Sequence, residues 1–135
     1  MGDLEKNLSR IEMCCECCDF DTVDHQLVTV LQDAADHFQA FIKITGGNRC
    51  KKHNDSLRVD YELSSGRHGA KTAENSQHLY GRAADFKLYS VSDHQQIDPG
   101  IVYDYIGSIY AGALGIGLYS NYVHVDTRTG NARRW

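Results

Sequence analysis

The pattern of apolar positions predicts three helices. Between residues 22 and 39 the apolar residues recur at helical spacing, which predicts an amphipathic helix capped by Asp21-Thr22. Ser9-Arg10-Ile11-Glu12 fits a capping box and predicts a short helix before it. Asp98-Pro99 has the chemistry of a helix start and predicts a helix to about Ala111. The glycines that follow are expected to end this last helix: Gly112, Gly115 and Gly117.

The remaining apolar runs are short and predict strands. Residues 41–45 and 83–89 read as single strands, and residues 118–119 and 122–127 read as a hairpin around a turn at Ser120-Asn121. A long polar loop over residues 48–77 separates the first two strands, and such loops are often functional. This order predicts an α+β fold, with a small, mostly antiparallel sheet and helices packed on one side.

Length and composition fit an ordinary globular protein. The chain has 135 residues, of which 41% are hydrophobic and 24% charged, so we expect one domain over residues 1–135. Its first 20 residues, a helix and a cysteine-rich segment, should pack onto that domain. The net charge of −4 gives no general attraction to nucleic acid. No long apolar run indicates a signal peptide or a membrane span, so we expect a monomer made in the cytoplasm without a membrane partner.

An odd number of cysteines argues against a disulfide framework. The chain contains five, Cys14, Cys15, Cys17, Cys18 and Cys50. Reduced and partly buried thiols are the favoured interpretation. A metal or a disulfide that involves Cys50 stays open as the alternative.

His78, Asp85 and His124 are the candidate metal ligands. His78 and Asp85 are separated by small residues that allow close backbone approach. Taken alone, a histidine and an aspartate are more often surface or capping residues. The strand period places Tyr122, His124 and Asp126 on one face, which is usually a solvated face. His124 would nevertheless supply the third protein ligand that a catalytic zinc requires.

These residues carry a family resemblance that spans residues 9–135. Residues 76–85 match every defined position of Ser-x-His-x-x-Gly-x-Ala-x-Asp, the first motif of the zinc D-Ala-D-Ala peptidases. Tyr122-Val123-His124 resembles their second motif, a strand that ends in a ligand histidine. Residues 44–50 and 53–54 resemble the family's segment before the first motif, and residues 132–135 resemble the tail of small phage and bacterial members. The fold of this family is shared with hedgehog signalling domains.

The resemblance implies a role for each matching residue. His78, Asp85 and His124 would bind one Zn²⁺ per chain. Arg49 would hold a carboxylate of the substrate, for which a planar fork of donors is suited. Ser76 and Gln77 would shape the substrate site, with Ser76 in polar contact with the substrate.

The catalytic base is where the chain departs from the family pattern. Several members carry an acid three residues before the last ligand, and here that position is Asn121. Asp126 is the nearest acid, and two roles stay open for it: general base, or a carboxylate that orients a ligand histidine. His68, in the long loop, is a weaker candidate base.

The resemblance implies a hydrolase, a zinc metallopeptidase acting on the stem peptides of bacterial peptidoglycan. It leaves open whether the enzyme is a D-Ala-D-Ala carboxypeptidase or an endopeptidase. A phage endolysin that degrades the cell wall after release through a holin lesion fits the size of the chain. The alternative is an inactive zinc-containing binding module of the hedgehog type. A purely structural zinc is less expected, because such sites usually use four protein ligands.

Overall fold

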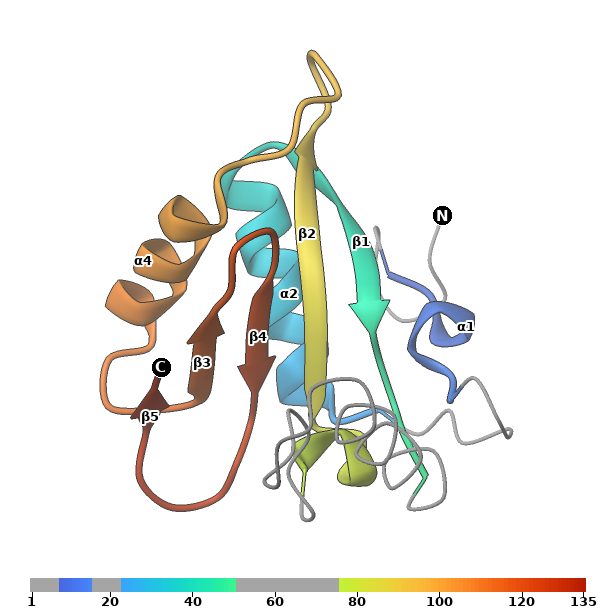
Figure 1. Ribbon diagram of the computed structural model, residues 1–135, viewed down its shortest axis with the longest axis vertical. Coiled ribbons are helices and arrows are strands. Elements are labelled where there is room, and N and C mark those ends of the chain that lie inside the picture. Colours follow the sequence, from blue (N-terminus) through green and yellow to red (C-terminus); the bar gives the residue numbers. More distant parts are fainter. Residues whose placement is uncertain (1–7, 16–22, 51–75) are drawn as a thin grey trace, which may run out of the picture.

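The computed structural model describes residues 8–15, 23–50 and 76–135. Five strands within them form one sheet in the order β1-β2-β4-β3-β5 (Figure 1). Only β5 pairs in parallel, with β3, and all other pairs are antiparallel. The predicted α+β class with a mostly antiparallel sheet is therefore confirmed. The strands are β1 (Ala40–Gly46), β2 (Ala83–Ser90), β3 (Gly115–Leu118), β4 (Val123–Asp126) and β5 (Arg133–Arg134).

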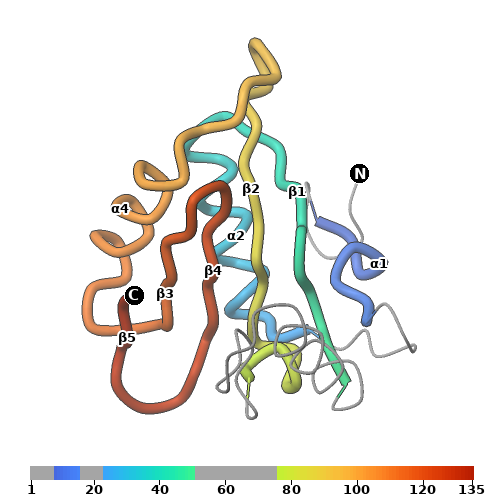
Figure 2. Tube along the Cα trace, in the orientation of Figure 1, coloured from blue at the N-terminus to red at the C-terminus, as the bar shows by residue number. Residues whose placement is uncertain are grey.

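Helices α2 (His25–His37) and α4 (Pro99–Ile109) cover one face of the sheet (Figure 1). Their apolar stripes meet the inward side chains of the strands in a single cluster of buried residues. The short helix α1 (Arg10–Met13) and strand β5 lie at opposite edges of the sheet (Figure 2). The alternate side chains of β2 and β4, including Asp85 and His124, project from the face that α2 and α4 leave uncovered.

The start of α2 is tied to the loops that carry the candidate ligands. The helix begins at His25 with Asp24 as its N-cap residue, and the predicted cap at 21–22 lies outside the described residues. The Asp24 carboxylate accepts a hydrogen bond from Thr127 Oγ1 at 2.6 Å. Its backbone N–H donates to the Gly81 carbonyl at 2.8 Å. The helix therefore anchors both the turn before β2 and the end of β4.

The predicted C-terminal hairpin is present, but its first strand begins earlier in the chain than the sequence predicted. Strand β3 begins at Gly115, so Gly115 and Gly117 lie inside a strand rather than ending a helix. A Cβ at Gly115 would lie 2.5 Å from the Asp126 carboxylate, and one at Gly117 would lie 2.5 Å from Trp135 Nε1. These glycines make room for side chains from β4 and from the chain end, which a local pattern does not reveal. The two-residue strand β5 was not predicted.

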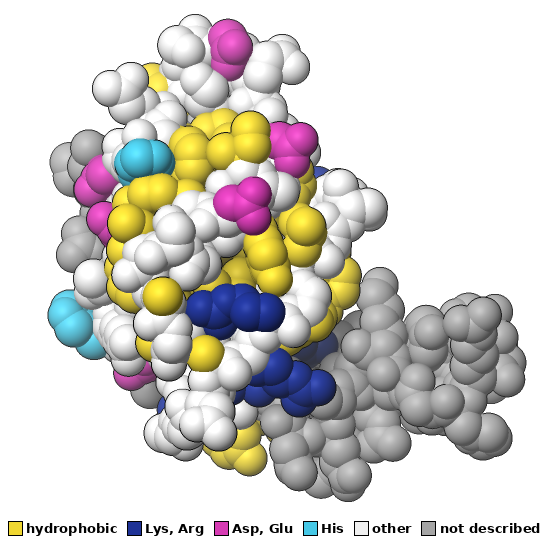
Figure 3. Space-filling view, turned by 90° about the vertical axis from the view of Figure 1, so that its left-hand side faces the viewer, with side chains coloured by type: hydrophobic (Ala, Val, Ile, Leu, Met, Phe, Trp, Pro, Cys, Tyr) yellow, Lys and Arg dark blue, Asp and Glu magenta, His cyan; other side chains and the backbone are white. Residues whose placement is uncertain are grey.

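The flank of the molecule around α4 keeps hydrophobic side chains at its surface, with basic side chains beneath them (Figure 3). Ile101 and Ile109 of α4 are each 55% exposed. Among the described residues, none of the helices combines the length and the apolar character needed to cross a membrane.

The helix α4 offers a test of the predicted cap. Asp98 accepts a hydrogen bond from the Gly100 N–H at 2.7 Å, and Pro99 occupies the first turn. We expect Asp98→Ala to lower the free energy of unfolding by about 1 kcal/mol, because a terminal N–H loses its partner. Urea denaturation measures the change. The exposed Asp104→Ala in the same helix serves as control, and equal losses in the two variants would contradict the capping role.

Candidate metal centre

The register of β2 and β4 brings Asp85 and His124 side by side. The two residues are direct partners across the antiparallel pair. Their side chains project from the same face, and Asp85 Oδ1 lies 2.8 Å from His124 Nδ1. Because directly opposed side chains are the closest neighbours on a sheet, the backbone alone places these two ligands together.

His78 reaches the same point from the 3-10 helix η1 (Gln77–Tyr80), which directly precedes β2. Gly81 ends this helix in the left-handed region with φ of 67°, which favours glycine. The Arg49 N–H donates to the His78 carbonyl at 2.9 Å, and His78 Nδ1 donates to the Gly47 carbonyl at 2.6 Å. The other ring nitrogen, Nε2, therefore faces Asp85 Oδ2 at 3.4 Å.

The three side chains fit a zinc ion. One ligand atom from each of His78, Asp85 and His124 lies within 4.8 Å of the other two. Two ligands of a tetrahedral zinc lie about 3.4 Å apart, since each bond is about 2.0–2.1 Å long. His78 Nε2 is fully buried and has no hydrogen-bond partner among the described residues, which is costly unless a metal occupies that lone pair. Two imidazoles and one carboxylate are a donor set of catalytic zinc.

The protonation states of His78 and Asp85 suit metal binding. Burial lowers the pKa of His78, which keeps the imidazole in the neutral form that binds metals. Burial alone would raise the pKa of Asp85. The hydrogen bond from His124 and the closeness of both imidazoles outweigh this effect and hold the pKa of Asp85 well below its usual range. The carboxylate therefore stays ionised in a mostly buried place.

Asp126 lies on the opposite side of the His124 ring from Asp85. Its Oδ2 is 2.8 Å from His124 Nε2, whereas Asp85 contacts Nδ1. Arg128 donates to both Asp126 oxygens, from Nε at 2.7 Å and from Nη2 at 2.6 Å. Asp126 is 0% exposed, so this strand face is covered rather than solvated at its position. A carboxylate on the outer nitrogen of a ligand histidine is a common support of zinc sites.

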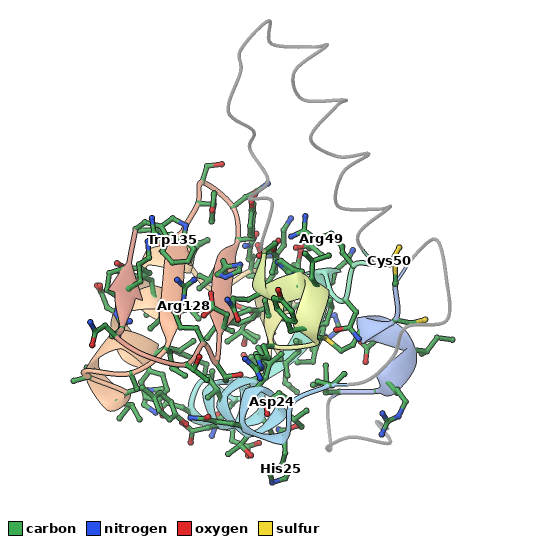
Figure 4. The ribbon with its side chains drawn as sticks, turned by 90° about the horizontal axis from the view of Figure 1, so that it is seen from below. Asp24, His25, Arg49, Cys50, Arg128 and Trp135 are labelled. Carbon is green, nitrogen blue, oxygen red and sulfur yellow. The ribbon has the colours of Figure 1, made fainter. Side chains whose placement is uncertain are left out.

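Arg49, Ser76 and Gln77 border the three ligands. Arg49 Nη2 donates to Ser76 Oγ at 3.5 Å, and Ser76 Oγ also accepts from the His78 N–H at 3.3 Å. Arg49 Nε and Gln77 Oε1 are buried, and neither has a hydrogen-bond partner in the part of the chain that the structure describes. Figure 4 shows Arg49 beside η1 and Trp135 beside the strands of the C-terminal hairpin, both on the side of the sheet away from Asp24 and α2.

The other predicted residues lie elsewhere. Asn121 is exposed in the hairpin turn, and its carbonyl accepts from Gln96 Nε2 at 2.8 Å. His68, Cys17 and Cys18 lie outside the described residues. No disulfide joins Cys14, Cys15 and Cys50 to one another, and the sulfur of the buried Cys15 accepts from the Cys50 N–H at 3.4 Å.

Two side chains at this centre, Arg128 and Trp135, were not among the predicted site residues. The spacing Asp126-x-Arg128 continues the strand period, and this signal would have allowed the ion pair to be predicted. Trp135 lies with its ring centroid 5.1 Å from that of His124. It arrives from the end of the chain next to β5, and no local pattern indicates that contact.

Fold and centre define an α+β protein with a His-Asp-His cluster suited to zinc. The peptidase M15 family matches residues 6–126, and the chain belongs to this family. The predicted family is thereby confirmed, and M15 peptidases are zinc-dependent. No curated protein matches the chain. The family match includes all three candidate ligands and ends before Arg128 and Trp135.

We expect His78→Ala to abolish stoichiometric zinc binding, because it removes one of three protein ligands. Metal analysis after dialysis should give about one zinc per chain for the unchanged protein and almost none for the variant. The control is His94→Ala, at a histidine that packs on Phe41 away from the centre. One zinc per chain in His78→Ala would refute the ligand assignment.

Asp126→Asn separates the two roles left open for this residue. If Asp126 orients His124, zinc should bind about 10–100-fold more weakly, and excess zinc should restore much of the activity. If Asp126 is the general base, activity should fall about 10²–10⁴-fold with zinc still bound. Zinc titration together with peptidase assays at low and high zinc measures the difference. Because both Asp126 oxygens are engaged by His124 and Arg128, we expect rescue by zinc.

Proposed function

We propose that this M15 family member is a zinc-dependent peptidase that hydrolyses a peptide bond in the D-amino-acid-containing stem peptides of bacterial peptidoglycan. The observation that carries the proposal is the convergence of three metal-binding side chains beside an arginine with an unsatisfied donor. The family match supports the peptidase class, and the substrate follows from the resemblance of residues 76–85 to the D-Ala-D-Ala peptidases.

His78, Asp85 and His124 would hold the zinc ion, with the Gly47 carbonyl and Asp126 fixing the two imidazole rings. Bound there, zinc supplies Lewis-acid chemistry, polarising the scissile carbonyl and lowering the pKa of a coordinated water toward about 7. The hydrogen bonds to the outer ring nitrogens matter because they select the tautomer that presents a lone pair to the metal.

Arg49 is the proposed anchor for a carboxylate of the substrate. Burial lowers its pKa, while the nearby Asp85 raises it, and the guanidinium remains charged at neutral pH. Its backbone is fixed to the His78 carbonyl, so the side chain starts next to a metal ligand. Ser76, which contacts the Arg49 guanidinium, would limit the orientations that this group can adopt.

Asp126 is proposed as the residue that positions His124 rather than as the base. Burial would raise its pKa, but hydrogen bonds from Arg128 and His124 outweigh burial and hold the pKa well below its usual range. A carboxylate in this state is a poor proton acceptor. The amide of Asn121 does not accept a proton either, so the proposal assigns no base at that position.

The bond that is cut depends on which carboxylate Arg49 holds. A carboxypeptidase requires the carboxylate at the end of the peptide, whereas an endopeptidase can use another carboxylate of the stem. We favour cell-wall lysis by an endolysin of phage type, made in the cytoplasm as a monomer and reaching the wall through a holin lesion. The resemblance of residues 132–135 to small phage and bacterial members supports this setting.

Incubation with purified peptidoglycan tests the proposed function. We expect fragment release that a chelator abolishes and added zinc restores, and mass analysis of the fragments identifies the bond. Asp85→Ala, which lacks the central ligand, is the matched inactive control. Binding to peptidoglycan without any fragment would favour the alternative of a hedgehog-type binding module.

Arg49→Lys tests the proposed anchor. A lysine keeps the charge but loses the two-point grip on a carboxylate, so kcat/KM on a stem peptide should fall by at least about tenfold. Stability and zinc content should change little. The control is Arg10→Lys in α1, at the edge of the sheet. Equal kinetics for both variants and the unchanged protein would remove Arg49 from the substrate site.

A further inference from the structure

The indole of Trp135 lies across strand β3, on the sheet face that carries the candidate ligands. Beyond β5, the Trp135 N–H donates to the Ile116 carbonyl at 3.1 Å, and its carbonyl accepts from the Leu118 N–H at 2.8 Å. Its Nε1–H donates to the Tyr119 hydroxyl at 2.8 Å. A Cβ at Gly117 would lie 2.5 Å from this nitrogen, so only glycine leaves room for the ring.

The same ring contacts the metal centre from outside. Its centroid lies 5.1 Å from that of His124, at an interplanar angle of 43°. The Arg128 guanidinium carbon lies 5.4 Å from the ring centroid, a cation–π distance. Arg128 in turn holds both oxygens of Asp126, and Asp126 holds His124 Nε2. Trp135 therefore contacts both ends of the series Arg128–Asp126–His124.

We propose that Trp135 is a positioning residue of the metal centre, which fixes His124 by packing on its ring and on the arginine that holds Asp126. This inference rests on the metal centre of the proposed function. It assigns a role to a residue beyond the family match, which ends at residue 126.

The neighbouring Arg134 also attaches the end of the chain, but without a contact to the metal centre. Its guanidinium donates to the carbonyls of Leu114 at 2.8 Å and Ala113 at 2.9 Å, on the side of α4. Trp135 is still 41% exposed, so it contributes less to the core than its size allows. Its ring contacts Tyr119, Arg128 and His124, and also Arg133 of β5, whose guanidinium carbon lies 5.7 Å from the ring centroid.

Removal of the indole is expected to weaken zinc binding through its effect on the buried Asp126. Without the indole, Arg128 loses its stacking partner and water gains access to Asp126, which is 0% exposed in the structure. A hydrogen bond weakens when water competes for its partners, so His124 Nε2 would be held less firmly. A ligand ring that turns more freely binds zinc less tightly.

The test compares Trp135→Ala with Arg134→Ala, which weakens the attachment of the same chain segment without a contact to His124. Zinc affinity is measured by competition with a chromogenic chelator, thermal unfolding of both metal-free variants is recorded, and ¹⁵N NMR reports the His124 tautomer. We expect Trp135→Ala to bind zinc about 10–100-fold more weakly and to give a mixture of tautomers. Arg134→Ala should lower Tm and keep zinc affinity within a few-fold.

Two further variants guard against a simple folding defect. Trp135→Phe keeps a ring over His124 and Arg128 and should recover most of the affinity. Gly117→Ala keeps the indole but displaces it, and should reproduce the weaker zinc binding. Unchanged affinity in Trp135→Ala, or equal losses of affinity in Trp135→Ala and Arg134→Ala, would overturn the positioning role while the proposed function stands. Absence of zinc binding in the unchanged protein would overturn both.

Discussion

Strands β2 and β4 are paired in a register that sets Asp85 directly against His124, and the geometry of the centre depends on this pairing. A slip of β4 by one residue against β2 would turn His124 toward α2 and α4 and bring the core residue Val123 to the open face. The buried apolar faces of the two strands therefore specify the position of the ligands as well as the stability of the sheet. The ligands need no long flexible side chains to reach each other.

A second set of contacts holds each ligand ring from its outer side. His78 is fixed by the Gly47 carbonyl, which β1 delivers at its end, and His124 is fixed by Asp126. Arg128 and Trp135 complete the support of Asp126 and come from the last residues of the chain. The centre thus joins β1, η1, β2, β4 and the chain end, which are far apart in sequence. Such a preformed arrangement lowers the cost of ordering ligands when a metal binds.

Local patterns in the sequence predicted the elements well wherever a periodic segment was long. The stripe of α2 and the cap and proline of α4 are strong signals, and both helices are present with ends no more than three residues from the expected ones. The start of β3 was misplaced because its glycines were interpreted only as breakers. Gly115 and Gly117 lack side chains because Asp126 and Trp135 lie against them. Spacing along the chain does not encode such tertiary contacts.

At the site, too, the sequence indicated the candidate ligands but not the contacts that support them. The motif of residues 76–85 and the histidine at 124 could be recognised because ligand chemistry restricts residue type and spacing. The role of Asp126 could not be resolved from sequence, since a base and an orienting carboxylate have the same side chain. Only its position on the outer nitrogen of His124, with Arg128 on both oxygens, favours the orienting role. The contact of Trp135 arises from the pairing of the chain end with β3, and the resemblance of residues 132–135 to family members does not indicate it.

X-ray absorption spectroscopy at the zinc edge of the zinc-loaded protein reports the ligand atoms themselves. A centre formed by His78, Asp85 and His124 should give only nitrogen and oxygen neighbours at about 2.0–2.2 Å, with the multiple-scattering signature of two imidazoles. Sulfur neighbours at about 2.3 Å would contradict it, since they would place the metal on the cysteines instead of on His78, Asp85 and His124.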